Sequence, residues 1–202
     1  MPLFAMRVWL PDRPGALGAV ASRVGAVRGD VVGIEIIERG AGRAVDELTV
    51  DLPDADLVDL LVNEVHEIDG VDVEDVRALG HLHEDLAVSA LEVAGAVATA
   101  DTPAVAASAI VHGAIRLLHA DWAALVDLAA EALVDGAGQD LPNAGWLCAF
   151  ARGATADGTE ADLEQFAFAV VPEHRWTLVV FRDHLPLRGR ERALLDGLGV
   201  LG

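Results

Sequence analysis

The stretch that decides the fold is Phe4-Ala5-Met6-Arg7-Val8-Trp9-Leu10, followed directly by Pro11-Asp12-Arg13-Pro14-Gly15-Ala16-Leu17. In the first run Phe4, Met6, Val8 and Leu10 recur with period two, which predicts a half-buried strand. Proline and glycine then interrupt the strand. Apolar residues at helical spacing follow as far as Val27, which predicts an amphipathic helix. The chain therefore begins with a strand that leads through a short loop into a helix.

The next fifty residues repeat these two patterns. Alternation predicts strands at residues 31–38 and 48–52, a helix at residues 54–68 and a further strand at residues 71–76. The order strand, helix, strand, strand, helix, strand is that of a ferredoxin-like split βαβ unit, with both helices on one face of the sheet. The sequence thus predicts an α+β fold.

Two motifs in this region resemble those of the ACT domain, a small ligand-binding module that regulates many enzymes of amino-acid metabolism. The resemblance covers residues 3–79 and rests on Asp12-Arg13-Pro14-Gly15-Ala16-Leu17 and on Gly29-Asp30-Val31-Val32. It implies a dimer with a small amino acid bound at the seam. The ligand-binding residues that it implies are Asp12, Arg13, Gly15, Ala16, Leu17, Asp30, Val31 and Val32. At the position of Asp30 the family often has asparagine, so the amide donor is lost here.

The chemistry of the loop supports a ligand independently of the family. Gly15 allows a positive φ or a close backbone approach. The amides of Ala16, Leu17 and Gly18 begin a helix and are expected to lack internal acceptors, so that they favour an anion. Asp12 or Asp30 offers an acceptor for an ammonium group. The alternative is structural: such residues also shape and cap the entrance of a helix.

The second half of the chain reads as a separate domain, with domain boundaries at 1–79, 80–100 and 101–202. Residues 80–100 are rich in alanine and predict a linker helix. Asp101-Thr102-Pro103 predicts the start of the next helix. Further elements are predicted as a strand at 122–128, a hairpin of strands 166–171 and 176–181, and a closing helix at 187–201.

This half resembles the GAF domain, a sensory α/β fold with an antiparallel sheet. The matching stretches are His119 to Val126 and Trp176 to Asp183, the latter leading into Leu187 to Arg192. The Asn-Lys-Phe-Asp-Glu signature of the cyclic-nucleotide-binding members is absent. The segment from Asp135 to Gln165 is too short for the usual elements that cover the pocket, so the resemblance implies a domain without a ligand.

An apolar strand at residues 31–37 would lie at the edge of the first sheet, where it needs a partner strand. We therefore expect a symmetric homodimer. The face of that sheet away from the helices is expected to carry six side chains: Trp9, Ile37 and Val45 beside Arg7, Glu35 and Glu47.

Composition excludes several classes of partner. The net charge is −19, and all 14 basic residues are arginine, which argues against a uniform nucleic-acid or anionic-membrane binder. No apolar run approaches the roughly 20 residues of a transmembrane helix. The single Cys148 fits a reducing cytoplasm. No cofactor is expected.

Motifs of catalytic or metal sites are weak. No Gly-x-Gly-x-x-Gly, Walker A or Gly-x-Ser-x-Gly motif occurs. Three groups of residues have two readings each. Cys148 could act as a nucleophile with His174 or His184, or be a small buried apolar residue. A metal could bind to His66, His81, His83 and Glu84, or these residues could lie in a solvated linker. A phosphate or an acidic partner could bind to Arg182, Arg188, Arg190 and Arg192, or these arginines could pair with residues 157–164. The structural interpretation is favoured in all three cases, so no catalytic or metal site is expected.

Two functions remain. The leading hypothesis is a non-enzymatic, allosteric regulatory protein that binds a small amino acid at a dimer seam, with the second domain reporting the change. The alternative is a ligand-free interaction module for dimerisation or for docking a protein partner. A small hydrolase ranks third, because no nucleophile and base converge in the sequence.

Overall fold

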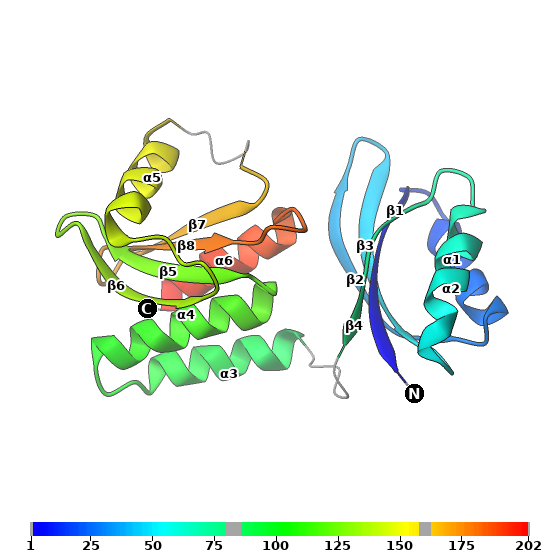
Figure 1. Cartoon of the computed structure of the whole chain (residues 1–202), viewed down its shortest axis with the longest axis horizontal. Helices are drawn as coiled ribbons and strands as arrows, with labels where there is room; N and C mark the ends of the chain where they lie inside the picture. Colours follow the sequence, from blue (N-terminus) through cyan, green and yellow to red (C-terminus); the bar gives the residue numbers. More distant parts are fainter. Residues whose placement is uncertain (1, 80–85, 158–162, 202) are drawn as a thin grey trace. The chain divides into compact units, whose positions relative to one another are not determined.

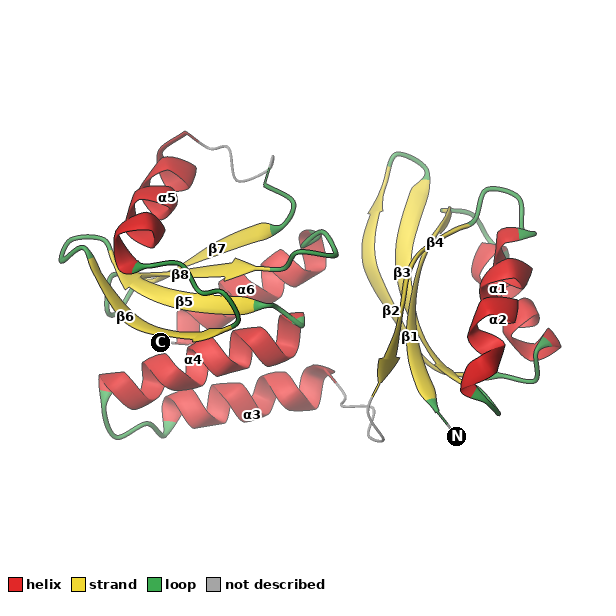
Figure 2. Ribbon diagram, viewed as in Figure 1, coloured by secondary structure: helices red, strands yellow, loops and turns green. Residues whose placement is uncertain are grey.

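A computed structural model describes residues 2–79, 86–157 and 163–201. The chain divides into two units, Met1–His83 and Glu84–Gly202, each with its own sheet and its own core (Figures 1 and 2).

The first unit has the expected ferredoxin-like order. Its elements are β1 (Leu3–Pro11), α1 (Ala16–Ala26), β2 (Asp30–Gly40), β3 (Arg43–Asp51), a 3-10 turn (Ala55–Leu57), α2 (Val58–His66) and β4 (Asp72–Leu79). The strands form an antiparallel sheet in the order β2-β3-β1-β4. Both helices cover one face of this sheet (Figure 2). The prediction of an α+β fold with this topology is confirmed.

Strand alternation builds the core of the first unit. Met6 and Val8 on β1 face the helices together with Leu48 and Val50 on β3, and all four are fully buried. The helices complete the core with Val20 and Val24 of α1 and with Leu61 and Val65 of α2. On both helices these residues are four apart and so share one face.

The second unit is also an α+β layer structure. Its elements are α3 (Leu86–Ala98), α4 (Pro103–Leu118), β5 (Trp122–Asp127), β6 (Ala132–Gly138), α5 (Ala144–Asp157), β7 (Phe166–Val171), β8 (Trp176–Phe181) and α6 (Gly189–Leu201). The antiparallel sheet has the order β6-β5-β8-β7. One core joins this sheet to α3, α4 and α6, and a second core joins its other face to α5 (Figure 1). The antiparallel sheet, the hairpin and the capped start of α4 are confirmed; the resemblance to GAF domains stays a prediction.

Two expectations for this unit need correction. The helix expected as a linker over residues 80–100 runs from Leu86 to Ala98 and belongs to the second unit. Val93 packs so closely on α4 that a Cβ at Gly113 would lie 2.5 Å from its Cγ1. The segment from Asp135 to Gln165, expected to be too short for the usual elements that cover the pocket, contains the end of β6 and all of α5, which packs on one face of the sheet. Within the described ranges, no helix combines the length and apolar character needed to cross a bilayer.

Candidate functional site

The loop between β1 and α1 has the backbone conformation that its sequence predicts. Gly15 precedes α1 with φ 90° and ψ −14°, a region that favours glycine. A Cβ at this position would meet no atom within 4 Å, so glycine is needed for its conformation rather than for space. The amide of Ala16 donates to the carbonyl of Arg13 at 3.3 Å. The expectation that this amide lacks an internal acceptor is therefore wrong.

A cavity of about 220 Å³ lies beside this loop. One wall comes from the loop and the first turn of α1, and the other comes from the turn between α2 and β4. The lining residues are Pro11, Arg13, Pro14, Gly15, Ala16, Ala19, Ile68, Asp69 and Val71. The turn approaches β1 closely, because a Cβ at Gly70 would lie 3.1 Å from Cγ of Pro11.

Arg13 and Asp69 are the charged side chains that line this cavity. Neither side chain forms an ion pair or a hydrogen bond within the described part of the chain. Most arginines of the first unit do have carboxylate partners; these are Arg7, Arg23, Arg39, Arg43 and Arg77. The cavity thus presents one exposed cation and one exposed anion that have no partner among the described residues.

The structure brings together only part of the predicted ligand set. Arg13, Gly15 and Ala16 line the cavity, whereas Asp12 and Leu17 do not. Asp12 is exposed, and its Oδ1 lies 4.0 Å from Nε of Arg39. Leu17 packs against the core of the unit.

The other predicted ligand residues lie at the far end of the sheet. Asp30 begins β2 opposite Asp51, and Asp51 in turn lies opposite Leu3, at the start of β1. The Gly15 loop follows the other end of that nine-residue strand, about 26 Å away at ~3.3 Å per residue. Helix α1 carries the chain back along the sheet, so Asp30, Val31 and Val32 cannot face the loop within one chain.

Asp46 carries a buried carboxyl group and is not among the residues predicted from the sequence. It lies on β3 between Val8 and Ile36, on the face that the helices cover, and is 3% exposed. Its Oδ1 has no hydrogen-bond partner among the described residues. Burial raises the pKa of this carboxyl; the charge of Arg39 lowers it and that of Asp12 raises it further.

The sequence held signals for both missed acids. Ala44, Leu48 and Val50 alternate toward the core, so Asp46 is the one polar residue in that row. Asp69 precedes a glycine at the end of α2, a pattern that marks a turn and gives no hint of what the turn faces.

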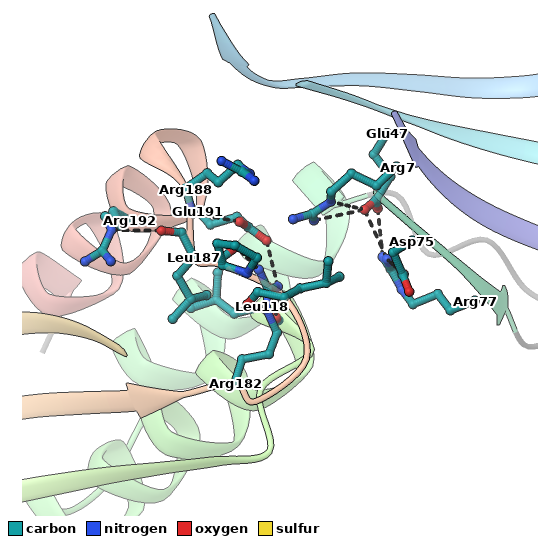
Figure 3. A network of polar contacts seen from close by, with 12 residues as sticks. Arg7, Glu47, Asp75, Arg77, Leu118, Arg182, Leu187, Arg188, Glu191 and Arg192 are labelled. Carbon is teal, nitrogen blue, oxygen red and sulfur yellow. Dashed lines mark hydrogen bonds and ion pairs between the residues drawn. The ribbon is translucent and has the colours of Figure 1, made fainter. Parts of the chain in front are cut away.

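The outer face of the first sheet carries a network of ion pairs (Figure 3). Glu47 accepts hydrogen bonds from Arg7 at 2.9 and 3.1 Å and from Arg77 at 2.8 and 3.1 Å. Burial raises the pKa of Glu47, but the hydrogen bonds and charges of Arg77 and Arg7 outweigh it, so the net pKa is lowered. Strand register confirms five of the six residues predicted for this face, since Arg7 and Glu35 lie opposite Glu47 and Trp9 lies opposite Val45. Ile37 lies at a register shift in β2, where it has no paired residue.

In the second unit a buried arginine holds the segment before α6 (Figure 3). Arg182 is 1% exposed. It donates to the carbonyls of Leu185 at 2.9 Å, Leu118 at 2.8 Å and Pro186 at 2.6 Å, and to Glu191 at 2.7 Å. These contacts make Arg182 a structural residue, which removes it from the predicted basic cluster.

Other predicted chemistry also proves structural or falls outside the described residues. Arg192 donates to backbone carbonyls of Leu187 and Leu163 at 2.9 Å. Most of the acidic stretch 157–164, and His81, His83 and Glu84, lie outside the described side chains. In the described ranges, no group of three His, Cys, Asp or Glu residues is placed to hold a metal ion.

The face of the second sheet under α5 is filled by aromatic rings. The chain has four tryptophans and five phenylalanines, and six of these nine rings contact one another here: Trp122, Trp146, Phe150, Phe166, Phe168 and Phe181. Cys148 lies in the same core, 2% exposed. Burial raises the pKa of its thiol, which favours the reading of Cys148 as a small buried residue.

A larger hollow, of about 530 Å³, lies in the second unit where β8 leads toward α6. Part of its lining holds the chain in place. Gln165 donates to the carbonyl of Asp183 at 2.6 Å, and the amide of Leu187 donates to the carbonyl of Glu164, also at 2.6 Å. The smaller cavity beside the Gly15 loop is the better candidate site, because Arg13, Gly15 and Ala16 of the predicted ligand set line it.

No family model and no curated protein matches the sequence. Partial likenesses exist among solved structures. A protein of unknown function from Galdieria sulphuraria is 14% identical, with 46% of this chain and 63% of that chain covered, at a TM-score of 0.35. The ACT domain of GTP pyrophosphokinase from Chlorobium tepidum is 16% identical, with coverage of 39% and 100% and a TM-score of 0.32.

A formyltetrahydrofolate deformylase from Pseudomonas putida is 17% identical, with 44% of this chain and 36% of that chain covered, at a TM-score of 0.31. The alignments thus span less than two thirds of the Galdieria and Pseudomonas proteins. Likeness at this level assigns no function to the chain, so any function must be argued from the site itself.

Proposed function

We propose that the chain is a non-enzymatic regulatory protein whose first unit, an ACT-like module, binds a small amino acid beside the loop between β1 and α1. The observation that carries this proposal is the cavity of about 220 Å³ against that loop. Pockets for drug-sized ligands measure about 300–1,000 Å³, so this one admits only a small molecule. Gly15, Ala16 and Arg13 line it, as the loop motif predicts.

We further propose that the protein is a homodimer joined through β2. This strand of eleven residues lies at the edge of the first sheet, with β3 as its neighbouring strand. Val32, Ile34 and Ile36 are 49%, 48% and 41% exposed. A long apolar edge is stabilised by pairing, and a second copy offers the same strand in an isologous contact.

A ligand regulates such a dimer only if it binds one arrangement better than the other. The cavity and β2 lie on two sides of the same loop, since Asp12 contacts Arg39 of β2 while Arg13 lines the cavity. A ligand that contacts the loop could therefore change how β2 pairs with β2 of the second copy.

The competing function is an interaction module without a ligand. It is favoured by the apolar outer surface of α3, where Val88 and Leu91 are 54% and 72% exposed. Such residues suit a protein partner.

Thermal unfolding of the full chain with a panel of amino acids separates the two functions. An amino acid at 100 times its Kd adds about 2.7 kcal/mol to the stability of the state that binds it, which raises the unfolding midpoint. If no amino acid raises the midpoint, the regulatory proposal fails and the interaction module is preferred.

Sedimentation of the full chain tests the dimer. Ile34→Lys is expected to give a monomer, whereas Val105→Lys, a control at a 53% exposed apolar position on α4, keeps the dimer. A wild-type monomer at high protein concentration would contradict the proposed pairing.

A further inference from the structure

We propose that the cavity beside the Gly15 loop holds both charges of a zwitterionic α-amino acid, the carboxylate on Arg13 and the ammonium group on Asp69. The inference rests on the proposed function and deepens it. It assigns the ligand class as amino acids with small, uncharged aliphatic side chains.

The carboxylate is assigned to the side of the cavity formed by the start of α1. Arg13 has no partner within the described part of the chain, and a guanidinium group can bind a carboxylate through two parallel hydrogen bonds. The first turn of α1, an eleven-residue helix, contributes Ala16 and Ala19 to the lining. The amino-terminal end of a helix carries a partial positive charge, so dipole and guanidinium favour an anion together.

The ammonium group is assigned to the opposite wall. Helix α2 ends at His66, and Ile68 and Asp69 follow it directly into the lining of the cavity. The carboxy-terminal end of a helix carries a partial negative charge, and the carboxylate of Asp69 adds to it. The amino-terminal end of α1 and the carboxy-terminal end of α2 lie on opposite sides of this cavity. The cavity therefore has a positive wall and a negative wall, which matches the two charges of a zwitterion.

The remaining lining sets the class of ligand side chain. Pro11, Ala19, Ile68 and Val71 are apolar, and Arg13 and Asp69 are the charged side chains of the lining. A third charge on the ligand would find no further charged side chain in this lining, which disfavours such a ligand. The volume of about 220 Å³ further restricts the occupant to small side chains.

The test uses NMR titration of the isotope-labelled full chain with L-alanine, with propionate, which lacks the ammonium group, and with ethylamine, which lacks the carboxylate. Arg13→Gln is expected to weaken L-alanine binding about tenfold to a hundredfold and to leave ethylamine binding unchanged. Asp69→Asn is expected to weaken L-alanine binding by a similar factor and to leave propionate binding unchanged. In the wild type, the amide signals of Ala16 and Val71 are expected to shift.

Two matched controls separate the site from general loss of charge. Arg28→Gln removes an arginine that has no side-chain partner in the described residues and follows α1 at the other end of the sheet. Glu67→Gln removes an exposed acid two residues before Asp69. Both variants are expected to bind L-alanine like the wild type, and all variants are checked for folding by circular dichroism.

The outcomes are distinguishable. If no amino acid of the wider panel binds the wild type, the proposed function fails and this inference with it. If L-alanine binds Arg13→Gln and Asp69→Asn as tightly as the wild type, the inference is overturned while the regulatory function stands. If propionate or ethylamine binds the wild type as tightly as L-alanine, one of the two ligand charges is not recognised and the inference is overturned. If neither analogue binds, both ligand charges are required, which supports the inference. Tighter binding of L-glutamate or L-lysine than of L-alanine would overturn the assigned side-chain class.

Discussion

Replacing Asp46 by valine is expected to raise the free energy of unfolding of the first unit. The carboxyl is 3% exposed, and its Oδ1 has no hydrogen-bond partner among the described residues. An unsatisfied buried polar group costs about 1–3 kcal/mol. Valine would place methyl groups beside Val8 on the neighbouring strand, and β-branched residues suit a strand. The expected gain at neutral pH is therefore about 1–3 kcal/mol.

The stability gained by Asp46→Val should decrease as the pH is lowered. Burial raises the pKa of Asp46 in the folded protein above its value in the unfolded chain, so the folded state keeps the proton to higher pH. The carboxyl then reduces stability as pH rises through the folded pKa, and this penalty is absent below the unfolded pKa of about 3.9. The advantage of valine should accordingly shrink as the pH is lowered toward 4.

Hydrogen exchange of β1 and β3 peptides in increasing urea measures the stability of the first unit separately from the second. Asp46→Asn is the matched variant, because it removes the charge but leaves a polar group to be satisfied; its gain should be smaller than that of valine. A valine variant that is no more stable than the wild type at pH 7 would refute the reasoning. So would a gain that stays constant as the pH falls.

Three further substitutions test single structural features. Arg182→Met is expected to destabilise the second unit by about 3–5 kcal/mol, because it removes the ion pair of the buried Glu191 and the donor to three backbone carbonyls. Urea unfolding measures the loss, and a change below about 1 kcal/mol would contradict the role of this network. Gly15→Ala is expected to destabilise the first unit by about 1–2 kcal/mol because of its positive φ. Gly18→Ala, with open space inside α1, should instead stabilise it by about 1 kcal/mol. Equal effects of the two alanines would contradict the conformational argument.

The fold of the first unit was predictable because each strand buries one face and so alternates in sequence. The positive φ of Gly15 was also predictable, since the loop motif places glycine at the start of a helix. The elements missed in the second unit have weak local signals. β6 is Ala-Leu-Val-Asp-Gly-Ala-Gly, a composition that disfavours strands, and it forms because β5 offers it a backbone partner. Helix α5 lacks charged residues until Arg152, so its sequence shows little amphipathic contrast.

The site was predictable only in part, because a local motif does not show which residues distant in the sequence lie next to it in space. The loop residues Arg13 and Gly15 belong to one local motif and line one cavity. Asp69 comes from a turn more than fifty residues later, which reaches the loop only because α2 runs back beside α1. Asp30 belongs to a second motif, and α1 moves the chain to the other end of the sheet before β2 begins, so the two motifs do not meet within one chain.

The position of Cys148 offers a direct view of motion in the second unit. It is the sole cysteine of the chain, it lies on the face of α5 that packs against the sheet, and burial raises the pKa of its thiol. Because the thiolate is the reactive form, a thiol reagent modifies Cys148 only after α5 lifts from the sheet. The rate of labelling therefore reports how often that helix opens, without any engineered probe.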